Sequence, residues 1–275
     1  MVFYALHIPG IEDERVRLLA EACSSLKISF KEVDPFSYDL AKNSPVQPGD
    51  MVYRVSRGKI LQTFEKFFLT PGVVTFYTDP WHHGGDPFVF EKEGIACPKT
   101  IFCPTNNRER LISYVEALGG FPIVIKALGG TRGLGVMKID SFSTLFGIVD
   151  YLLSQCKLIT LCQYIPVKTS ARFIVLGDKV IASLEYRAKG HDFRSNEAST
   201  PIVIGKKYPA ALERLAVHAT KVLGLEFSGV DILIHEAKPY VTEVNFPCNF
   251  VRPQTVLDMD IARAMIEYLS GKGYN

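Results

Sequence analysis

The stretch "GVDILIHEAKPYVTEVNFPCNF", residues 229–250, carries three oxygen-bearing side chains within two apolar segments. Asp231 lies near the start of the first segment, and Glu243 and Asn245 lie near the end of the second. Alternate residues of a strand leave the same face of a sheet, so Glu243 and Asn245 share a face. A turn at residues 236–239 brings Asp231 alongside them. The stretch therefore predicts a hairpin with two carboxylates and a carboxamide on one face.

The chemistry of this trio is typical of a magnesium site. Carboxylate and amide oxygens are hard ligands, and Mg²⁺ usually binds through a few of them while it keeps water and substrate phosphates on its other positions. Solvated carboxylates at strand ends are the alternative interpretation. Bare carboxylates inside "YVTEVNF" would be costly in a core. This cost favours a metal site formed by Asp231, Glu243 and Asn245.

A second informative stretch is "IKALGGTRGLGVMKI", residues 125–139, which has the pattern of a strand, a glycine-rich turn and a strand. Glycines let the backbone approach a ligand and point N–H groups at phosphate oxygens. Lys126 at the end of the first strand offers a point charge for a phosphate. No Gly-Lys-Ser/Thr follows, and "VMKID" continues as a strand, so neither a Walker A loop nor a helix-opening GxGxxG turn fits. The pattern predicts either a phosphate-binding hairpin or an ordinary glycine-rich loop.

Length and composition restrict the class of protein. A chain of 275 residues, 47% hydrophobic and 22% charged, is expected to bury a substantial core and to form two compact units. The formal charge of +2 gives no support for a nucleic-acid or polybasic membrane surface. No uncharged apolar run reaches the roughly 18 residues of a membrane span, and the start of the chain lacks the pattern of a secretory signal. Six cysteines without a CxxC pair are expected to be reduced thiols, which places the protein in the cytoplasm.

Short apolar segments alternate with amphipathic helical ones, which is typical of α/β construction. Residues 1–80 are expected to form a small α/β unit, and the turn-forming segment 79–87 marks its end. One helix of this unit has a predicted apolar face of Ile60, Leu61, Phe64, Phe67 and Phe68. Strands are predicted at 2–8, 28–34, 50–57, 157–165, 171–177, 179–188, 229–236 and 239–246, and helices from residue 12, at 106–120, 141–154, near 207–223 and near 255–269.

The order of these motifs resembles the ATP-grasp superfamily, and within it the RimK-like branch of glutamate and peptide ligases. The resemblance is carried by the strand lysine with its glycine hairpin and by "QYI", "RFIVLG", "AKGHDFRSN", "GVD" and "EVN". It covers most of residues 85–270. Residues 1–80 are similar to the small N-terminal domain of the family, in which "MVYRVSRGKILQTFE" sits like a "PRxG" strand and helix.

The resemblance implies an α/β (α+β) chain with the ATP-grasp fold, in which two α/β lobes clamp ATP after a small N-terminal α/β domain. The expected divisions are an N-terminal domain at 1–82, a small lobe with the glycine-rich lid at 83–160, and a C-terminal lobe with the metal site at 161–275. ATP and Mg²⁺ are the implied cofactors, with Mn²⁺ as an alternative metal.

Site residues follow from the resemblance position by position. Asp231, Glu243 and Asn245 match the magnesium ligands. Arg172 and Arg194 match arginines that face the phosphates or the acyl substrate, and Asn196 completes the match to "FRSN". These three are the candidate catalytic residues. The candidate ATP-binding residues in the phosphate site, the lid and the hinge are Lys126, Gly129, Gly130, Thr131, Arg132, Gly133, Gly135, Gln163, Tyr164, Ile165 and His83.

The implied activity is ATP-dependent ligation of a carboxylate to an amine through an acyl phosphate, adding an amino acid such as glutamate to a peptide or small metabolite. The partners are then small molecules and peptides, without nucleic acid or membrane, and self-association into homo-oligomers stays open. Another ATP-grasp ligase, similar to glutathione synthetase or D-alanine ligase, is the first alternative. A nucleotide-binding protein without turnover is the second.

Three departures from the family pattern bear on these expectations. His83 stands at the position of a second ATP lysine, and a histidine carries its full charge only below about pH 6.5. The hinge "CQYIPVKTSAR" is about two residues short and lacks a carboxylate for the ribose. After "EVN" the chain continues as "FPCNFVRPQ", where Cys248 is expected to be structural. No residue stands out as the base that deprotonates the amine.

Overall fold

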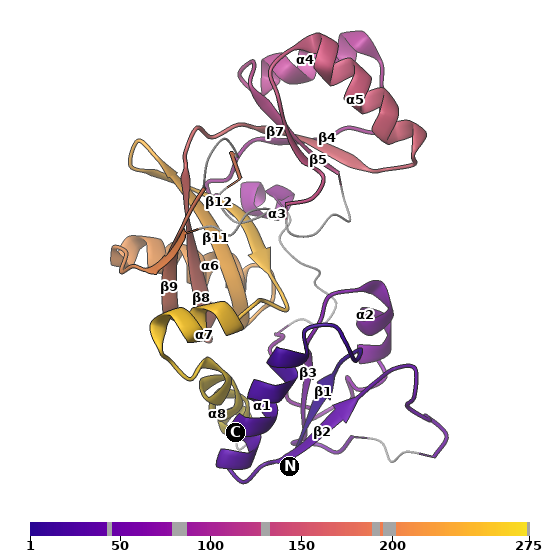
Figure 1. The fold of residues 1–275 in the computed structure, drawn as a ribbon, viewed down its shortest axis with the longest axis vertical. Helices are drawn as coiled ribbons and strands as arrows, with labels where there is room; N and C mark the ends of the chain where they lie inside the picture. Colours follow the sequence, from indigo (N-terminus) through magenta and orange to yellow (C-terminus); the bar gives the residue numbers. More distant parts are fainter. Residues whose placement is uncertain (43–45, 79–86, 128–132, 189–192, 195–201, 274–275) are drawn as a thin grey trace.

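The computed structural model describes residues 1–42, 46–78, 87–127, 133–188, 193–194 and 202–273. Three sheets of three, five and four strands follow one another along the long axis of the molecule, and each has helices packed beside it (Figure 1). The five-stranded sheet lies between the other two. None of the described helices has the length and apolar character needed to cross a membrane.

The N-terminal unit holds a parallel sheet of order β2-β1-β3. Its elements are β1 Val2–Leu6, α1 Asp13–Ser25, β2 Ser29–Val33, β3 Met51–Arg54 and α2 Lys59–Glu65. The predicted apolar face of the second helix is wrong at two positions, because Ile60 and Phe67 are 55% and 60% exposed. Leu61, Phe64 and Phe68 alone face the core. Residues 60 and 67 are seven apart, so they share one side of the helical turns, beside the buried face and outside it.

The small lobe is an antiparallel sheet of order β4-β7-β5-β6, with α4 and α5 beside it in Figure 1. The side chain of Asn107 caps α4 and that of Ser141 caps α5, each through a backbone N–H of the first turn. The glycine hairpin is formed as predicted, since β5 and β6 pair antiparallel. The elements are β4 Thr100–Phe102, α4 Arg108–Ala117, β5 Ile123–Ala127, β6 Val136–Ile139, α5 Phe142–Ser154 and β7 Ile159–Gln163. The short helix α3 Pro87–Lys92 precedes them in the chain and packs through Phe90 into the core of the five-stranded sheet.

The five-stranded sheet has the order β10-β9-β8-β11-β12. Both predicted hairpins of this sheet are confirmed, since β8 pairs with β9 and β11 with β12 in antiparallel register. One face packs on α6 through an apolar core that includes Phe173, Ala216 and Val230. The elements are β8 Thr169–Leu176, β9 Lys179–Arg187, β10 Ile202–Gly205, α6 Ala210–Lys221, β11 Phe227–His235 and β12 Lys238–Asn245.

The single helix predicted near 255–269 is wrong, because two helices occupy this region: α7 Val251–Leu257 and α8 Ile261–Lys272. Asp258 adopts a left-handed backbone conformation (φ 51°), which ends α7. Asp260 then caps α8 by accepting a hydrogen bond from the Arg263 backbone N–H at 2.9 Å. A local break of this kind leaves the apolar periodicity intact, so the sequence pattern alone does not reveal it.

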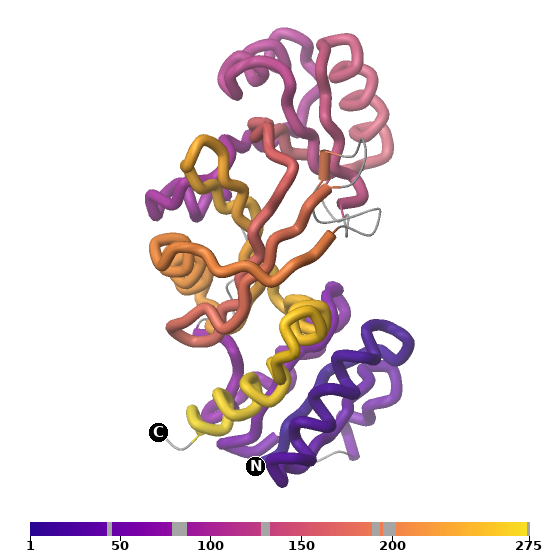
Figure 2. The backbone as a smooth tube through the Cα atoms, turned by 60° about the vertical axis from the view of Figure 1, so that its left-hand side comes forward, coloured from indigo at the N-terminus to yellow at the C-terminus, as the bar shows by residue number. Residues whose placement is uncertain are grey.

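The C-terminal helix returns to the N-terminal unit. α8 runs beside α1 in Figures 1 and 2, and Gly273, which follows α8, lies beside Met1. One buried cluster joins Leu19 of α1, Phe227 of β11 and Met265 of α8. The N-terminal unit and the five-stranded sheet therefore share a core. The division of the chain at residues 82 and 160 remains a prediction.

Candidate active site

The two carboxylates of the predicted metal trio lie directly opposite each other on one hairpin. In the β11–β12 register Asp231 pairs with Glu243, and Gly229 pairs with Asn245. The turn between the strands is made by Glu236 and Ala237, both with positive φ, in agreement with the predicted turn region. Residues directly opposite in an antiparallel pair present their side chains on the same face. The structure thus brings the predicted trio together.

Asp231 is held by an arginine of the neighbouring strand. Arg172 on β8 pairs with Asp231 in the sheet register, and its Nε and Nη2 donate to the two carboxylate oxygens at 2.7 and 2.5 Å. The side chains are 13% and 4% exposed. Burial lowers the pKa of the Arg172 guanidinium, but Asp231 outweighs this effect and raises it above the ordinary value. The Arg172 guanidinium thus stays charged beside this carboxylate. Asn245 Nδ2 lies 3.4 Å from Asp231 Oδ2.

Glu243, unlike Asp231, is half exposed to solvent and only loosely paired. Its carboxylate is 47% exposed, and its partner is Arg57 of the N-terminal unit, with Nη1 at 3.7 Å from Oε1. This distance is too long for a hydrogen bond. The sequence did not reveal this contact, because Arg57 fell inside a strand predicted to run to residue 57, whereas β3 ends at Arg54.

The donor set fits Mg²⁺ by its chemistry. No group of three or more His, Cys, Asp and Glu side chains suited to a metal occurs among the described residues. The trio instead combines two carboxylates with a carboxamide oxygen, and Glu243 keeps an exposed carboxylate available for an ion. Asp231 would have to share its oxygens between Arg172 and the metal.

The glycine hairpin places a lysine at its root. Lys126 forms the last pair of the β5–β6 ladder with Val136, and on its other side it pairs with Thr160 of β7, one position before β5 ends at Ala127. Gly135 has a φ of +82°, and a Cβ there would lie 3.1 Å from the Cβ of Ala127, so glycine is required. The Arg194 guanidinium donates to the Gly133 carbonyl at 2.8 Å. This contact brings Arg194 of the five-stranded lobe to the lid.

The hinge residues connect the small lobe to the five-stranded sheet. The Gln163 N–H donates to the Lys99 carbonyl at 2.8 Å. The Tyr164 ring lies edge-on to Phe193, and the Lys138 ammonium lies 5.1 Å from its centroid. Ile165 is 6% exposed. Tyr164 is thus packed between an aromatic ring and a cation of the two lobes.

Six predicted site residues lie outside the described part of the chain: His83, Gly129, Gly130, Thr131, Arg132 and Asn196. Their roles stay predictions.

Cys248 is a structural thiol, as expected. It is 1% exposed, and a Cβ on Gly229 would lie 3.0 Å from its Cβ. Burial raises the pKa of the thiol to about 12, although the charges of Arg15, Arg172 and Arg57 pull it down. A thiol in this state is a poor nucleophile.

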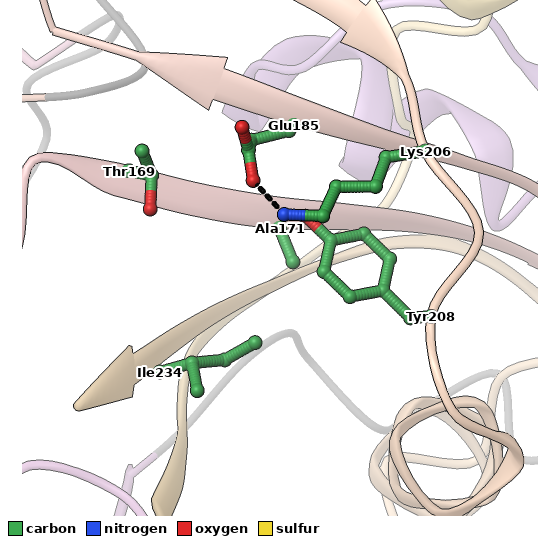
Figure 3. Close-up of a pocket in the computed structure, with 6 residues that line it drawn as sticks. All are labelled: Thr169, Ala171, Glu185, Lys206, Tyr208 and Ile234. Atoms are coloured by element: carbon green, nitrogen blue, oxygen red, sulfur yellow. Dashed lines mark hydrogen bonds and ion pairs between the residues drawn. The ribbon is translucent and has the colours of Figure 1, made fainter. Parts of the chain in front are cut away.

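A cavity of about 230 Å³ lies on the other face of the five-stranded sheet and is lined by Thr169, Ala171, Glu185, Lys206, Tyr208 and Ile234 (Figure 3). Ala171 belongs to the core under α6, and neighbouring residues of a strand face opposite sides, so the cavity is separate from Arg172. The carboxylate of Glu185 accepts from Lys206 and from Arg187 Nε. Burial opposes ionisation, but these two cations lower the pKa of Glu185. The charges of this cavity are thus already paired.

The sequence of this chain matches the family of the RimK-like ATP-grasp domain over residues 88–269, more than half of its length. The chain therefore belongs to the RimK-like ATP-grasp family, and the predicted family is confirmed. It is 33% identical over 183 residues to a "Probable alpha-L-glutamate ligase" of Ectopseudomonas mendocina, an alignment that covers 66% of this chain and 60% of the relative. The chain spans from 45% to 61% of the length of the curated relatives it matches.

Solved structures agree on the fold. The RimK domain ATP-grasp protein of Sphaerobacter thermophilus superposes with a TM-score of 0.73 at 18% identity, covering 98% of this chain and 99% of that one. The ATP-grasp ligase PsnB, in complex with a phosphomimetic variant of a minimal precursor, Mg and ADP, gives a TM-score of 0.74 at 17% identity, with 98% of both chains covered. The predicted ATP-grasp fold is therefore confirmed.

Proposed function

We propose that this chain is an ATP-dependent carboxylate–amine ligase that forms an amide through an acyl phosphate. The observation that carries the proposal is the register of β11 and β12, which sets Asp231 directly opposite Glu243 with Asn245 beside them. Family membership supports the same activity, since the relatives are named as glutamate ligases. A protein that only bound nucleotide would have less need for a full set of metal ligands.

ATP and Mg²⁺ are the proposed cofactors. Asp231, Glu243 and Asn245 would hold Mg²⁺, which would neutralise charge on the phosphates. Lys126 and Arg194 extend this positive field to the glycine lid. Arg172 holds the Asp231 carboxylate in a fixed direction through two hydrogen bonds. Such a field is needed because a substrate carboxylate must approach a polyphosphate of the same charge.

The proposed chemistry has two steps. A carboxylate oxygen attacks the γ-phosphorus of ATP, the bond to the β,γ-bridging oxygen breaks, and ADP leaves. The lone pair of an amine then attacks the acyl carbon, the bond from this carbon to the phosphate oxygen breaks, and phosphate leaves while the amine loses a proton. A lid on the glycine hairpin keeps water from the acyl phosphate.

An amino acid and a peptide or small metabolite are the proposed substrates, with glutamate as the first candidate amino acid. The names of the relatives and the peptide precursor bound to PsnB support this choice. The cytoplasm is the proposed location, since all six cysteines are free thiols. Self-association stays open.

Release of ADP and phosphate tests the proposal. Protein with Mg²⁺, ATP, amino acids and short peptides is expected to release both products only when an acid and an amine are present together. Glu243→Gln removes one charge and little volume, so it should abolish turnover without unfolding the protein. Glu236→Gln, in the exposed turn of the same hairpin, is the matched control and should keep full activity. Turnover that survives Glu243→Gln unchanged contradicts the proposed metal site.

A nucleotide-binding protein without turnover is the second candidate. It is favoured by one observation, the full occupation of both oxygens of Asp231 by Arg172. Tight binding of MgADP together with no ADP release for any acid and amine would support this candidate.

A further inference from the structure

We propose that Arg57 binds the substrate carboxylate that becomes phosphorylated. This inference rests on the proposed ligase activity and adds a substrate-binding residue that belongs to the N-terminal unit. Arg57 follows β3 and precedes α2 by two positions, and its guanidinium reaches the five-stranded sheet at Glu243.

The position of Arg57 fits this role. Its Nη1 lies 3.7 Å from a carboxylate that we assign to the metal site, and this carboxylate is directly opposite Asp231. The reacting carboxylate must meet the phosphate beside the metal ligands. A guanidinium at this point is therefore within reach of the reacting group.

The state of Arg57 distinguishes it from the arginines around it. Arg172 makes two short hydrogen bonds to a buried carboxylate. Arg54 is buried and bonded to Glu65 and to the Ser56 carbonyl. Within the described part of the chain Arg57 has one ion pair, which is long, and its side chain is 44% exposed.

A substrate carboxylate can replace Glu243 as the partner of Arg57, because the present ion pair is weak. An exposed ion pair of this kind contributes little because water screens it, and a substrate carboxylate can offer the guanidinium two parallel hydrogen bonds. Glu243 would at the same time be engaged by the metal. Arg57 is therefore the cation best able to change its partner when a substrate arrives.

The direction of approach also separates the two substrates. The glycine lid and hinge, which we assign to ATP, belong to the small lobe, whereas Arg57 belongs to the N-terminal unit at the opposite end of the five-stranded sheet (Figure 1). Arg15, Arg57 and Arg172 all lie near Cys248, where they lower the pKa of its thiol, and Arg172 is already paired with Asp231. Arg15 is itself held by Glu12 and the Val55 carbonyl. An acid bound by Arg57 would therefore approach from the N-terminal unit, whereas ATP would approach from the small lobe.

The first measurement uses hydroxylamine as the amine, so that ADP release reports on the carboxylate alone. L-Glutamate and tri-L-glutamate are the acids, and the variants are Arg57→Gln, Arg57→Lys and the exposed neighbour Lys59→Gln as matched control. Arg57→Gln should raise the KM for the acid about tenfold or more, because it removes a charged hydrogen bond. The KM for MgATP and the Kd of MgADP should stay within about twofold of wild type. The KM of Arg57→Lys for the acid should lie between those of wild type and Arg57→Gln, because lysine keeps the charge but lacks the paired N–H donors of a guanidinium.

The second measurement needs no turnover. The acid, added to protein with MgADP, should raise the Tm of wild type and of Lys59→Gln, and this shift should be lost in Arg57→Gln. A shift or an acid KM that Arg57→Gln leaves unchanged overturns the inference while the ligase activity stands. Loss of MgADP affinity in the same variant also overturns it, since Arg57 then binds phosphate. If wild type releases no ADP with any acid, the proposed function fails. The Tm shift then decides only whether Arg57 binds a carboxylate. Loss of the shift in Arg57→Gln supports this binding role, and its persistence there or its absence from wild type overturns it.

Discussion

Arg172 and Asp231 form an ion pair with both partners largely withdrawn from water, whereas Glu243 and Arg57 meet at the surface. The negative charge of Asp231 is therefore expected to matter more for stability than that of Glu243. Removing one partner of a buried pair leaves an uncompensated charge, and removing one partner of an exposed pair does not.

Asp231→Asn is expected to lower the free energy of unfolding by about 3 kcal/mol or more, because Arg172 then stays buried without its counter-charge. Glu243→Gln should change it by less than about 0.5 kcal/mol. Urea unfolding followed by circular dichroism measures both. The double variant Arg172→Met, Asp231→Leu is the control, and it should recover part of the loss. Equal stability of the two single variants would show that the Arg172–Asp231 pair has no structural role.

Cys248 and Cys156 should differ sharply towards iodoacetamide. Cys248 is buried with a pKa of about 12, so at pH 8 its thiolate fraction is on the order of one in ten thousand. Cys156 is exposed and should react first. Peptide mass mapping after short exposure measures the two sites, with Cys156→Ser as the control that removes the fast modification. Rapid labelling of Cys248 in the folded protein would contradict its structural role.

At the scale of elements, glycine has opposite effects in the lid and in a helix. Gly135 needs its positive φ and its close contact with Ala127. Gly147 lies in the interior of α5, and a Cβ there would have no heavy atom within 4 Å. A glycine in such a helix position only adds freedom to the unfolded chain.

Gly135→Ala is expected to destabilise the protein by about 1 kcal/mol or more and to raise the KM for ATP, because it strains the root of the lid. Gly147→Ala should stabilise it by about 0.5–1 kcal/mol and leave the KM unchanged. Thermal unfolding and ADP release measure these effects. An unchanged KM for ATP in Gly135→Ala would contradict a role of the lid in ATP binding.

The elements also show where the sequence was sufficient. The β11–β12 register follows from the period of two and a short turn, so the positions of Asp231, Glu243 and Asn245 were predictable. The pairing of β8 with β11 joins strands far apart in the chain, and no local pattern reveals that Arg172 faces Asp231. The contact between Arg57 and Glu243 is even less accessible to local patterns, because it depends on how the N-terminal unit packs against the five-stranded sheet. Local patterns thus predicted the carboxylates, and the resemblance named Arg172 without its contact to Asp231. Neither of them pointed to Arg57.

At the scale of the whole molecule, the N-terminal unit and the five-stranded sheet are expected to unfold together, because α1, β11 and α8 share one core. Met265→Ala should lower the free energy of unfolding by about 2–5 kcal/mol. The exposed Met259→Ala is the control, with a change below about 0.5 kcal/mol. Circular dichroism measures the unfolding of the whole chain, and hydrogen exchange measures the stability of the N-terminal unit. Met265→Ala should lower both stabilities together. A separate transition for residues 1–78 would contradict the shared core.

This shared core gives the active site its geometry. It fixes Arg57 of one unit against Glu243 of another, while the lid and hinge are supplied by the small lobe. Substrate acid and nucleotide are thus expected to meet over the β11–β12 hairpin from different units.

ATP is proposed to activate a substrate carboxylate as an acyl phosphate, and oxygen isotopes test this step directly. Protein is given Mg²⁺, ATP, hydroxylamine and tri-L-glutamate with ¹⁸O in its carboxylates, and the released phosphate is analysed by mass spectrometry. Transfer of the carboxylate oxygen through an acyl phosphate predicts one ¹⁸O atom in each phosphate and one fewer in the acyl product. Release of phosphate without ¹⁸O, while the hydroxamate accumulates, would contradict the acyl phosphate and with it the ligase mechanism.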